Sequence, residues 1–408
     1  MRDDLWMVHE LLQIPENQKD IRGKHFGFCE YLRDQGRRIT IITANRSHLL
    51  KRNVKTTYPI RIQHTDGIRI IYIKSLQVKK TNSLNRLLNW IHFAFWLFCL
   101  FIILRRPKTV FLSVLPQTII WSYYWAYFWR RKPTLWLEIR DIWPMSGVEL
   151  MNLNSKSLIV RLMTLTEIKG YRIADKILSP LLTFDLYLEK FSDEIRNKYM
   201  LFPNGILQNN YLTVTKNPIP NKKDSPNDRL KLGYFGGLNN SNNLEGIIKS
   251  LSSISIDFEL NIYGTGSKKK LLESIPDSRL FIYNSVSRDE AIKIMKSMDF
   301  LLMGLHDLKV YRYGLASLKL TDYLVANKPI LYVAPNYFKF FKIYGLGVEF
   351  ISENLEELID VDKNTVDPTN EMYLNIRKSQ VEFLQGTMIL DNYFSSLDKF
   401  LDLNVDIA

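Results

Sequence analysis

Short apolar segments alternate with helical stretches along nearly the whole chain, and this alternation restricts the fold more than any other feature. Strand-like segments of the first half are 5–11, 38–44, 68–73, 108–114, 133–139 and 175–180. Those of the second half are 230–237, 258–264, 279–284, 299–305, 329–333 and 347–351. Buried strands joined by helices form parallel sheets covered by helices on both faces. The sequence therefore predicts an α/β protein with two doubly wound parallel sheets.

A polar, proline-bearing stretch at 207–230 separates the two sets of strands, and we expect a loop there after a boundary near Pro203. With 408 residues the chain is long enough for two cores. We predict an N-terminal domain at 1–202 and a C-terminal domain at 203–390. We expect the last segment, 391–408, to be a helix that packs back on the N-terminal domain.

Glycines follow the first two strands of the second half, where ligands bind in open α/β sheets. Gly236 and Gly237 follow the first of these strands, and Gly264 and Gly266 follow the second. Glycine lets the backbone approach a ligand, and the next helix start favours an anion. The glycines are equally consistent with tight turns that hold no ligand. Likewise the lysine run 268–270 either reaches a phosphate or forms a solvated helix face.

The stretch "YRYGLASLKLTDYLVANKPIL", residues 311–331, is the strongest candidate site. It reads as a short helix with Ser317 as N-cap and Asn327 as a left-handed C-cap. Lys319 and Asp322 then share one face near the helix start. There the ammonium group would meet an anion, and the carboxylate would accept hydrogen bonds from vicinal hydroxyls. The alternative is an exposed ion pair with no ligand.

The chain is basic, with 55 Lys and Arg against 42 Asp and Glu, a net charge of +13. This balance favours anionic partners, such as a membrane surface, nucleic acid or phosphorylated small molecules. The apolar segment 87–104 and the aromatic segment 119–129 are bracketed by arginines and lysines, and strand-like segments flank them. We therefore favour docking of segment 87–132 in the membrane interface over a buried helix or a true span. The candidate docking residues are Trp90, Phe95, Trp96, Arg105, Arg106, Trp125, Arg130 and Arg131.

Cysteine and histidine usage points to a reducing compartment and away from a metal centre. Cys29 and Cys99 lie far apart in apolar surroundings, which argues against a disulfide framework. The histidines are scattered and no Asp-x-Asp pair stands near them, so we expect no metal and no cofactor.

Several segments, in this order, resemble the retaining family 4 glycosyltransferases, in the branch related to fucosamine transferases of bacterial polysaccharide and O-antigen synthesis. The resemblance covers nearly the whole chain. The segments are "WMVHELLQIPENQKDIRGKHFGFCEYLRDQGRRITIITA", "LWLEIRDIWPMS", "EIKGYRIADKILSP", "FPNGI", "YFGGLNNSNNLEGI", "IYGTGSKKKL" and "YGLASLKLTDYLVANKPIL".

The resemblance implies a GT-B fold, in which two Rossmann-like domains face each other across an interdomain cleft. It implies a nucleotide-sugar donor on the C-terminal domain and a lipid-linked or glycan acceptor on the N-terminal one, without bound metal. Lys319 would bind the donor diphosphate and Asp322 the ribose. The full set of candidate donor-binding residues is Gly23, Gly236, Gly237, Gly264, Gly266, Lys268, Ser317, Leu318, Lys319 and Asp322.

Charge develops on the departing nucleoside diphosphate in such a transfer, so we expect fixed cations around it. Lys319 is the first candidate, and Arg312 or one of the lysines at 268–270 is the second. Asp141 is a third catalytic candidate, in the loop after a strand. His9 and Glu10, which end the first strand, are further candidates for the cleft.

The chain departs from the family pattern at three positions. Gly314 stands where an acidic residue would contact the sugar, and Arg140 stands near where many relatives carry histidine. Only Gly23 is present where a glycine pair is common. The identity of the sugar therefore stays open.

We predict a hexosyltransferase-type enzyme (EC 2.4) on the cytoplasmic face of the inner membrane. A nucleotide-sugar epimerase of the same fold is the alternative; it would not need the aromatic, basic segment 87–132. A non-enzymatic basic protein is disfavoured, because the charges are dispersed and we find none of the usual nucleic-acid modules.

Overall fold

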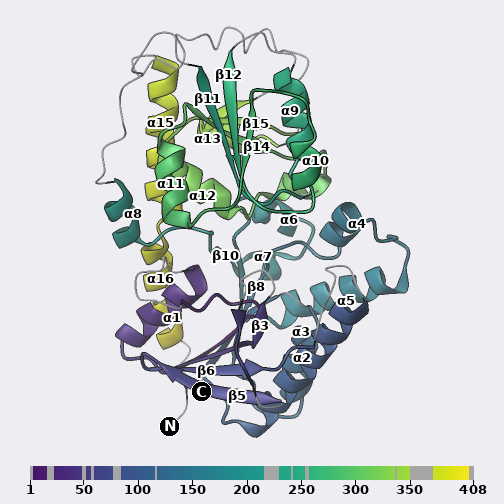
Figure 1. Ribbon diagram of the computed structural model, residues 1–408. Coiled ribbons are helices and arrows are strands. Elements are labelled where there is room, and N and C mark those ends of the chain that lie inside the picture. Colours follow the sequence, from purple (N-terminus) through teal and green to yellow (C-terminus); the bar gives the residue numbers. More distant parts are fainter. Residues whose placement is uncertain are drawn as a thin grey trace. The chain divides into compact units, whose positions relative to one another are not determined.

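The computed structural model describes residues 3–15, 23–47, 52–56, 59–76, 84–114, 117–215, 229–239, 242–252, 257–335, 338–349 and 371–403. The chain divides into two compact units (Figure 1). The N-terminal unit comprises Met1–Pro203 and Leu390–Ala408, and the C-terminal unit comprises Asn204–Ile389.

The N-terminal unit is built on an eight-stranded sheet in the order β10-β9-β8-β7-β1-β2-β6-β5. Its strands pair in parallel except for β5, which is antiparallel to β6. The strands are β1 (Leu5–Val8), β2 (Ile39–Ala44), β5 (Ile60–Thr65), β6 (Ile68–Ile73), β7 (Thr109–Ser113), β8 (Thr134–Glu138), β9 (Lys176–Ser179) and β10 (Tyr199–Leu201). A small separate pair consists of β3 (Arg46–Ser47) and β4 (Arg52–Asn53).

Helices and an apolar core complete this unit. The helices are α1 (Lys24–Asp34), α2 (Leu84–Ile103), α3 (Ile119–Ala126), α4 (Met145–Met151), α5 (Leu158–Ile173), α6 (Phe184–Leu188), α7 (Asp193–Arg196) and α16 (Leu390–Leu403). The C-terminal helix α16 lies against α1, where Phe394 packs on Phe28 with ring centroids 5.2 Å apart. Arg37 also donates hydrogen bonds to Asp398 and Asp402 of α16. Residues 404–408 lie outside the described residues.

The C-terminal unit contains a six-stranded parallel sheet in the order β13-β12-β11-β14-β15-β16. The strands are β11 (Leu230–Phe235), β12 (Phe258–Tyr263), β13 (Leu280–Tyr283), β14 (Phe300–Gly304), β15 (Ile330–Val333) and β16 (Gly347–Glu349). The helices are α8 (Gln208–Thr215), α9 (Leu244–Ser252), α10 (Lys269–Glu273), α11 (Arg288–Lys296), η1 (Lys309–Tyr313), α12 (Leu318–Ala326), α13 (Phe340–Tyr344), α15 (Glu371–Phe383) and the π-helix η2 (Leu384–Met388).

Both sheets are doubly wound, and each reverses its strand order beside its first strand. The reversal lies between β1 and β7 in the N-terminal unit and between β11 and β14 in the C-terminal unit. In open α/β sheets this switch point is where ligands bind, outside the carboxyl ends of the strands. The fold therefore directs attention to the residues that follow β1 and β11.

The structure corrects several boundaries predicted from sequence. Helix α8 occupies part of 207–230, where a loop was expected; the rest of that stretch, 216–228, lies outside the described residues. Strand β1 ends at Val8, so His9 and Glu10 belong to the loop that follows it.

Strands β3, β4, β5 and β10 were not predicted from the sequence. The segment of β5, "IRIQHT", mixes half-buried and exposed residues and lacks a continuous apolar run. The turn between β5 and β6 did contain a sequence indication of the hairpin, the pair Asp66 and Gly67. These two residues adopt positive φ angles of 47° and 78°. An Asp-Gly pair is typical of a two-residue hairpin.

Candidate functional site

A pocket of about 370 Å³ lies at the carboxyl ends of β11, β12 and β13, beside the start of α12. It is in the C-terminal unit and next to the β11/β14 switch point. Its lining is Phe235, Gly236, Gly237, Tyr263, Gly264, Thr265, Ser285, Val286, Arg288, Ala291, Met295, Leu318, Lys319 and Asp322.

Lys319 enters this pocket from the first turn of α12. Its ammonium group donates hydrogen bonds to the Tyr234 hydroxyl at 2.9 Å and to Asn242 Oδ1 at 3.0 Å. It also lies 4.2 Å from the centroid of the Tyr234 ring, a cation–π distance. These partners are all neutral, and no carboxylate of the described residues forms an ion pair with the ammonium group.

Burial without a counter-ion lowers the pKa of Lys319 to about 7 from its ordinary value of 10.5. Withdrawal from water disfavours the charged form of a lysine. An anion in the pocket would reverse this effect, because an opposite charge nearby stabilises the ammonium form. The geometry therefore suits Lys319 to a ligand that brings its own negative charge.

The glycines next to this lysine have clear steric reasons. Gly236 has a φ of +150°, and a Cβ there would lie 2.8 Å from Cε of Lys319. A Cβ on Gly264 would lie 2.0 Å from the Gly236 carbonyl oxygen, and one on Gly266 would lie 2.0 Å from the Leu238 carbonyl oxygen. The loops after β11 and β12 thus pack too closely for side chains. Close packing of the two loops accounts for Gly264 and Gly266, whereas Gly236 also makes room for the lysine.

Helix α12 begins and ends as the sequence predicts. Ser317 is its N-cap with an extended backbone, and Asn327 is a left-handed C-cap with a φ of 52°. The Ser317 side chain makes no capping hydrogen bond. The backbone N–H groups of the first turn are therefore oriented toward the strand ends by the helix itself rather than by a side-chain cap.

Asp322 lies one turn after Lys319 and pairs with Arg288, the first residue of α11. Arg288 Nε donates to Asp322 Oδ1 at 2.7 Å, and Nη2 lies 2.6 Å from the same oxygen. Burial raises the pKa of Asp322, and the Arg288 guanidinium opposes that rise. The alternative of an exposed Lys319–Asp322 ion pair is not what the structure shows; the partner of the Asp322 carboxylate is Arg288.

A row of stacked aromatic rings lies at the ends of the three strands. The Phe235 and Tyr263 rings stack with centroids 4.9 Å apart, and Tyr263 and Tyr283 stack at 4.6 Å. The three residues are register partners on β11, β12 and β13. Phe235 and Tyr263 form part of the pocket lining, so one wall of the pocket is aromatic.

Four predicted residues of this unit lie outside the pocket lining as described. Arg312 is exposed on η1, and Lys268 forms an ion pair with Glu245 at 2.7 Å. Gly266 allows the loop after β12 to pack closely, and Ser317 is the N-cap of α12. The second cation of the pocket is Arg288, which the sequence analysis missed together with Tyr234 and Asn242. The sequence did contain a signal for Arg288. It is a basic residue that directly follows Ser287, the N-cap of α11, shortly after a strand.

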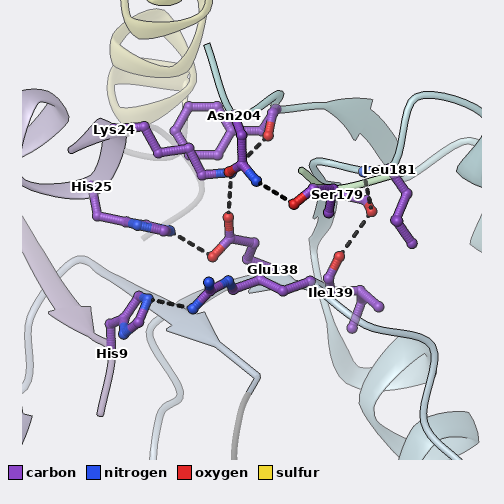
Figure 2. Close-up of polar contacts among 11 residues, drawn as sticks. His9, Lys24, His25, Glu138, Ile139, Ser179, Leu181 and Asn204 are labelled. Atoms are coloured by element: carbon purple, nitrogen blue, oxygen red, sulfur yellow. Dashed lines mark hydrogen bonds and ion pairs between the residues drawn. The ribbon is translucent and has the colours of Figure 1, made fainter. Parts of the chain in front are cut away.

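The N-terminal unit carries a second polar group, at the ends of β1 and β8 (Figure 2). Glu138 is fully buried, and its carboxylate binds two groups of the first turn of α1. Lys24 Nζ lies 2.7 Å from Oε1, and His25 Nε2 lies 2.6 Å from Oε2. Burial alone would raise the pKa of Glu138, but the Lys24 ammonium group and the hydrogen bond with His25 hold that pKa well below its usual range. Burial lowers the pKa of Lys24 to about 8.

His9 and Arg140 lie beside this group. Arg140 Nη1 lies 2.9 Å from His9 Nε2, and the His9 and His25 rings meet edge to face with centroids 4.6 Å apart. Gly23 is the N-cap of α1 and has no side chain to cap it. Asp141, predicted as catalytic, is exposed next to Arg140.

Helices α2, α3 and α5 lie side by side in the N-terminal unit (Figure 1), and the apolar side chains exposed on them and on the loop after α3 are called the exposed apolar face. Its most exposed residues are Trp129 at 85%, Ile103 at 76% and Leu158 at 71%. Of the predicted docking residues, Phe95, Trp125, Arg105 and Arg131 are exposed, whereas Trp90 and Trp96 are half-buried.

Two docking candidates also have structural roles. Arg130 donates to the Phe101 and Ile102 carbonyls at the end of α2, and Arg106 donates to the Arg131 carbonyl. Such contacts satisfy helix-end carbonyls. None of the described helices is long and apolar enough to cross a membrane. Within the same described ranges, no group of three or more His, Cys, Asp or Glu side chains is arranged to hold a metal ion.

No protein-family model matches the sequence, and a comparison with curated proteins finds no match. Solved structures do match over essentially the whole chain. Sucrose-phosphate synthase from Thermosynechococcus elongatus is similar with a TM-score of 0.68 and 10% identity, covering 100% of both chains. WaaG, a glycosyltransferase involved in lipopolysaccharide biosynthesis, has a TM-score of 0.58 and 13% identity over 97% of this chain and 99% of its own.

A third similar structure is Anabaena HepE, in complex with UDP and glucose. It has a TM-score of 0.60 and 9% identity over 98% of this chain and 100% of its own. At such identities the likeness establishes the fold. The chain has the GT-B fold with two parallel-sheet domains, as the sequence analysis predicted.

Proposed function

We propose that this protein is a glycosyltransferase that moves a sugar from a nucleotide-sugar donor to a lipid-linked or glycan acceptor. The observation that carries the proposal is the ammonium group of Lys319, which enters a strand-end pocket with only neutral partners. A half-buried cation without a counter-ion is costly unless a ligand supplies one. The similar structures include a complex with UDP, which agrees with a nucleoside diphosphate as that ligand.

In this proposal the donor diphosphate lies against Lys319 and the first turn of α12, where the helix dipole adds positive potential. The Asp322 carboxylate, held by Arg288, accepts hydrogen bonds from the ribose hydroxyls. Fixed cations then stabilise the charge that develops on the leaving diphosphate. We further propose retention of anomeric configuration, no requirement for metal, and a role in cell-surface polysaccharide or O-antigen synthesis. These finer features rest on the sequence resemblance to family 4 enzymes of the fucosamine-transferase branch.

We also propose that the protein works at the inner face of the cytoplasmic membrane. The sequence from 67 to 137 contains no Asp or Glu, whereas it contains eleven Lys and Arg residues. This acid-free segment supplies α2 and α3 of the exposed apolar face. Apolar side chains bordered by cations suit the interface of an anionic bilayer. Docking there would place the enzyme beside a lipid-linked acceptor.

The experiment is a thermal-shift screen of the full chain against uridine, guanosine and thymidine diphosphates. A ligand that binds only the folded state stabilises it by about 2.7 kcal/mol at a concentration of 100 Kd. We expect one diphosphate to raise Tm, with EDTA making no difference. Lys319→Ala should weaken binding about 10- to 100-fold, the loss of a charge-assisted hydrogen bond of about 1.5–3 kcal/mol.

Lys293→Ala is the matched control, because Lys293 is an exposed lysine on α11 of the same unit. Sugar transfer is then measured with membranes and the nucleotide-sugar that the screen selects. Transfer by Lys319→Ala at the rate of Lys293→Ala would refute the assignment of the site. Conversion of the nucleotide-sugar without acceptor or membranes would indicate the epimerase alternative instead.

A further inference from the structure

The polar group at the strand ends of the N-terminal unit contains an unsatisfied pair of hydrogen-bond donors. The Leu11 backbone N–H donates to His9 Nδ1 at 3.1 Å, so that nitrogen carries no proton. In a neutral imidazole the proton must then be on Nε2. Yet the atom facing Nε2, at 2.9 Å, is Nη1 of Arg140, which is also a donor.

Neither donor has an acceptor of its own. His9 is only 5% exposed, so water does not readily satisfy its Nε2–H. No carboxylate of the described residues lies within ion-pair distance of the Arg140 guanidinium; its recorded polar contact is His9. Two buried or half-buried donors that converge require an oxygen acceptor between or beside them.

Several charged groups surround this point. Lys24 and Arg140 are cations, and the carboxylates of Glu138 and Asp141 are the anions that interact with Arg140. Both histidines are neutral near pH 7, because burial lowers the pKa of His25 and lowers that of His9 well below its usual range. Glu138 is already bound by Lys24 and His25, and among the described residues neither it nor Asp141 forms a direct ion pair with Arg140.

The start of α1 adds positive electrostatic potential near Arg140. Lys24 and His25 are its first two residues, no acidic residue stands in its first turn, and its N-cap is Gly23. Among the described residues, a Cβ added to Gly23 would meet nothing closer than Gln13 Oε1 at 3.9 Å, so no described side chain covers Gly23. The free N–H groups of a helix start bind anions through their hydrogen bonds and dipole.

We propose that His9 Nε2–H, the Arg140 guanidinium and the first turn of α1 bind an anionic group, a carboxylate or a phosphate, on the acceptor. The assignment of this group to the acceptor rests on the proposed function; the anion site itself does not. Arg140 provides a planar fork of donors, which fits both kinds of oxyanion. The acceptor class is then an acidic glycan or a phosphate-bearing lipid or sugar, rather than a neutral sugar.

The test uses the full chain labelled with 15N in histidine, whose ring nitrogens report tautomer and hydrogen bonding. The His9 signals are assigned by their absence in His9→Gln. We expect the Nε2–H tautomer and a saturable shift on addition of sodium phosphate or sodium acetate. The stronger of the two anions identifies the acceptor group as a phosphate or a carboxylate.

Arg140→Gln should weaken that binding at least about tenfold, a loss of about 1.4 kcal/mol. Arg172→Gln, which removes an exposed arginine from the end of α5, should leave it unchanged. Arg140→Lys keeps the positive charge but loses the planar set of guanidinium donors, so it should give an intermediate affinity. If thermal melting shows that Arg140→Gln is unfolded, the affinity of Arg140→Lys tests the proposal in its place.

Three results would overturn the inference: a His9 Nδ1–H tautomer, a shift that does not saturate, or equal anion binding by Arg140→Gln and wild type. Uridine, guanosine and thymidine diphosphate binding is measured by Tm on the same samples. Anion binding at His9 without binding of any of these diphosphates would support this site while contradicting the proposed donor site. Diphosphate binding without an anion effect at His9 would support the proposed donor site and contradict the anion site at His9.

Discussion

At the scale of single residues, Lys319 is the side chain whose properties follow most directly from its surroundings. Tyr234 and Asn242 orient its ammonium group by hydrogen bonds but supply no negative charge. The pKa of about 7 records this imbalance. The lack of a counter-ion predicts how nucleotide binding depends on pH. It also predicts how the charged lysine changes the free energy of unfolding.

Nucleoside diphosphate affinity should fall as pH rises. The free pocket holds Lys319 with a pKa of about 7, and a bound diphosphate raises that pKa, so binding takes up a proton above pH 7. We expect affinity to decrease up to about tenfold per pH unit between pH 7 and 9. Calorimetric titrations in that range measure it. Lys319→Arg, charged throughout, should bind with a flat profile, and an equally steep profile for that variant would contradict the assignment.

Lys319→Met should stabilise the protein in the absence of ligand. Because the pKa of Lys319 is lower in the folded chain than in the unfolded chain, the unfolded state binds more protons between about pH 7 and 10.5. The cost of the buried charge is therefore complete below pH 7 and disappears as pH rises to 10.5. We expect the variant to melt higher than wild type at pH 6 and nearly equally at pH 10. A lower Tm at pH 6 would show that the hydrogen bonds outweigh the charge.

At the scale of elements, helix α2 shows how one segment divides its two faces between core and surface. Phe93, Leu97 and Phe101 are buried, whereas Phe95 and Ile103 are exposed. Residues 87–104 are almost all apolar, so the periodicity of apolar residues could not distinguish a buried helix from a helix in the membrane interface. The packing of α2 on α3 decides which residues stay outside.

The exposed residues at the ends of α2 and α3 should control membrane binding. Ile103→Ser combined with Trp129→Ser should weaken partition onto phosphatidylglycerol vesicles about tenfold or more, since each inserted side chain contributes about 1.5–3 kcal/mol when fully buried. Co-sedimentation measures the partition. Ile343→Ser is the matched control, because Ile343 is 71% exposed on α13 of the C-terminal unit. Equal losses in both variants would indicate non-specific adsorption.

At the scale of the whole molecule, two doubly wound sheets each present a switch point with polar residues beside it. The C-terminal unit has the lysine pocket after β11, and the N-terminal unit has the group around Glu138 after β8 and β1. Each unit has its own core, so ligand effects can be followed separately in the two. Hydrogen exchange is suited to this purpose because it reads protection segment by segment.

The nucleoside diphosphate selected by the thermal-shift screen should slow amide exchange in the loop after β11 and in the first turn of α12. These segments supply Gly236, Gly237 and Lys319 to the pocket. The middle of the β1–β7 pair should exchange at an unchanged rate in the same sample. Protection of the N-terminal sheet without protection at 236–239 would place the nucleotide elsewhere and contradict the proposed donor site.

Much of the architecture could be predicted from sequence because buried parallel strands are short apolar runs, and their spacing defines the crossovers. The same reasoning located Lys319, Asp322 and Gly236, since functional residues follow strand ends. It missed strand β5, because its segment has no buried residue and no continuous apolar run. It also assigned the second cation to Arg312 or to lysines 268–270, because neighbours in sequence are easier to see than neighbours in space.

The sequence by itself determined the α/β class, the helix caps at Ser317 and Asn327, and the placement of the candidate lysine after a buried strand. These features depend on local backbone preferences and on the period of apolar residues, which a linear sequence carries. Only the tertiary structure decided that Arg288 pairs with Asp322, that Lys319 has neutral partners, and that His9 meets Arg140. Those contacts join residues 34, 77, 85 and 131 positions apart, and only the folding of the sheets brings such residues together.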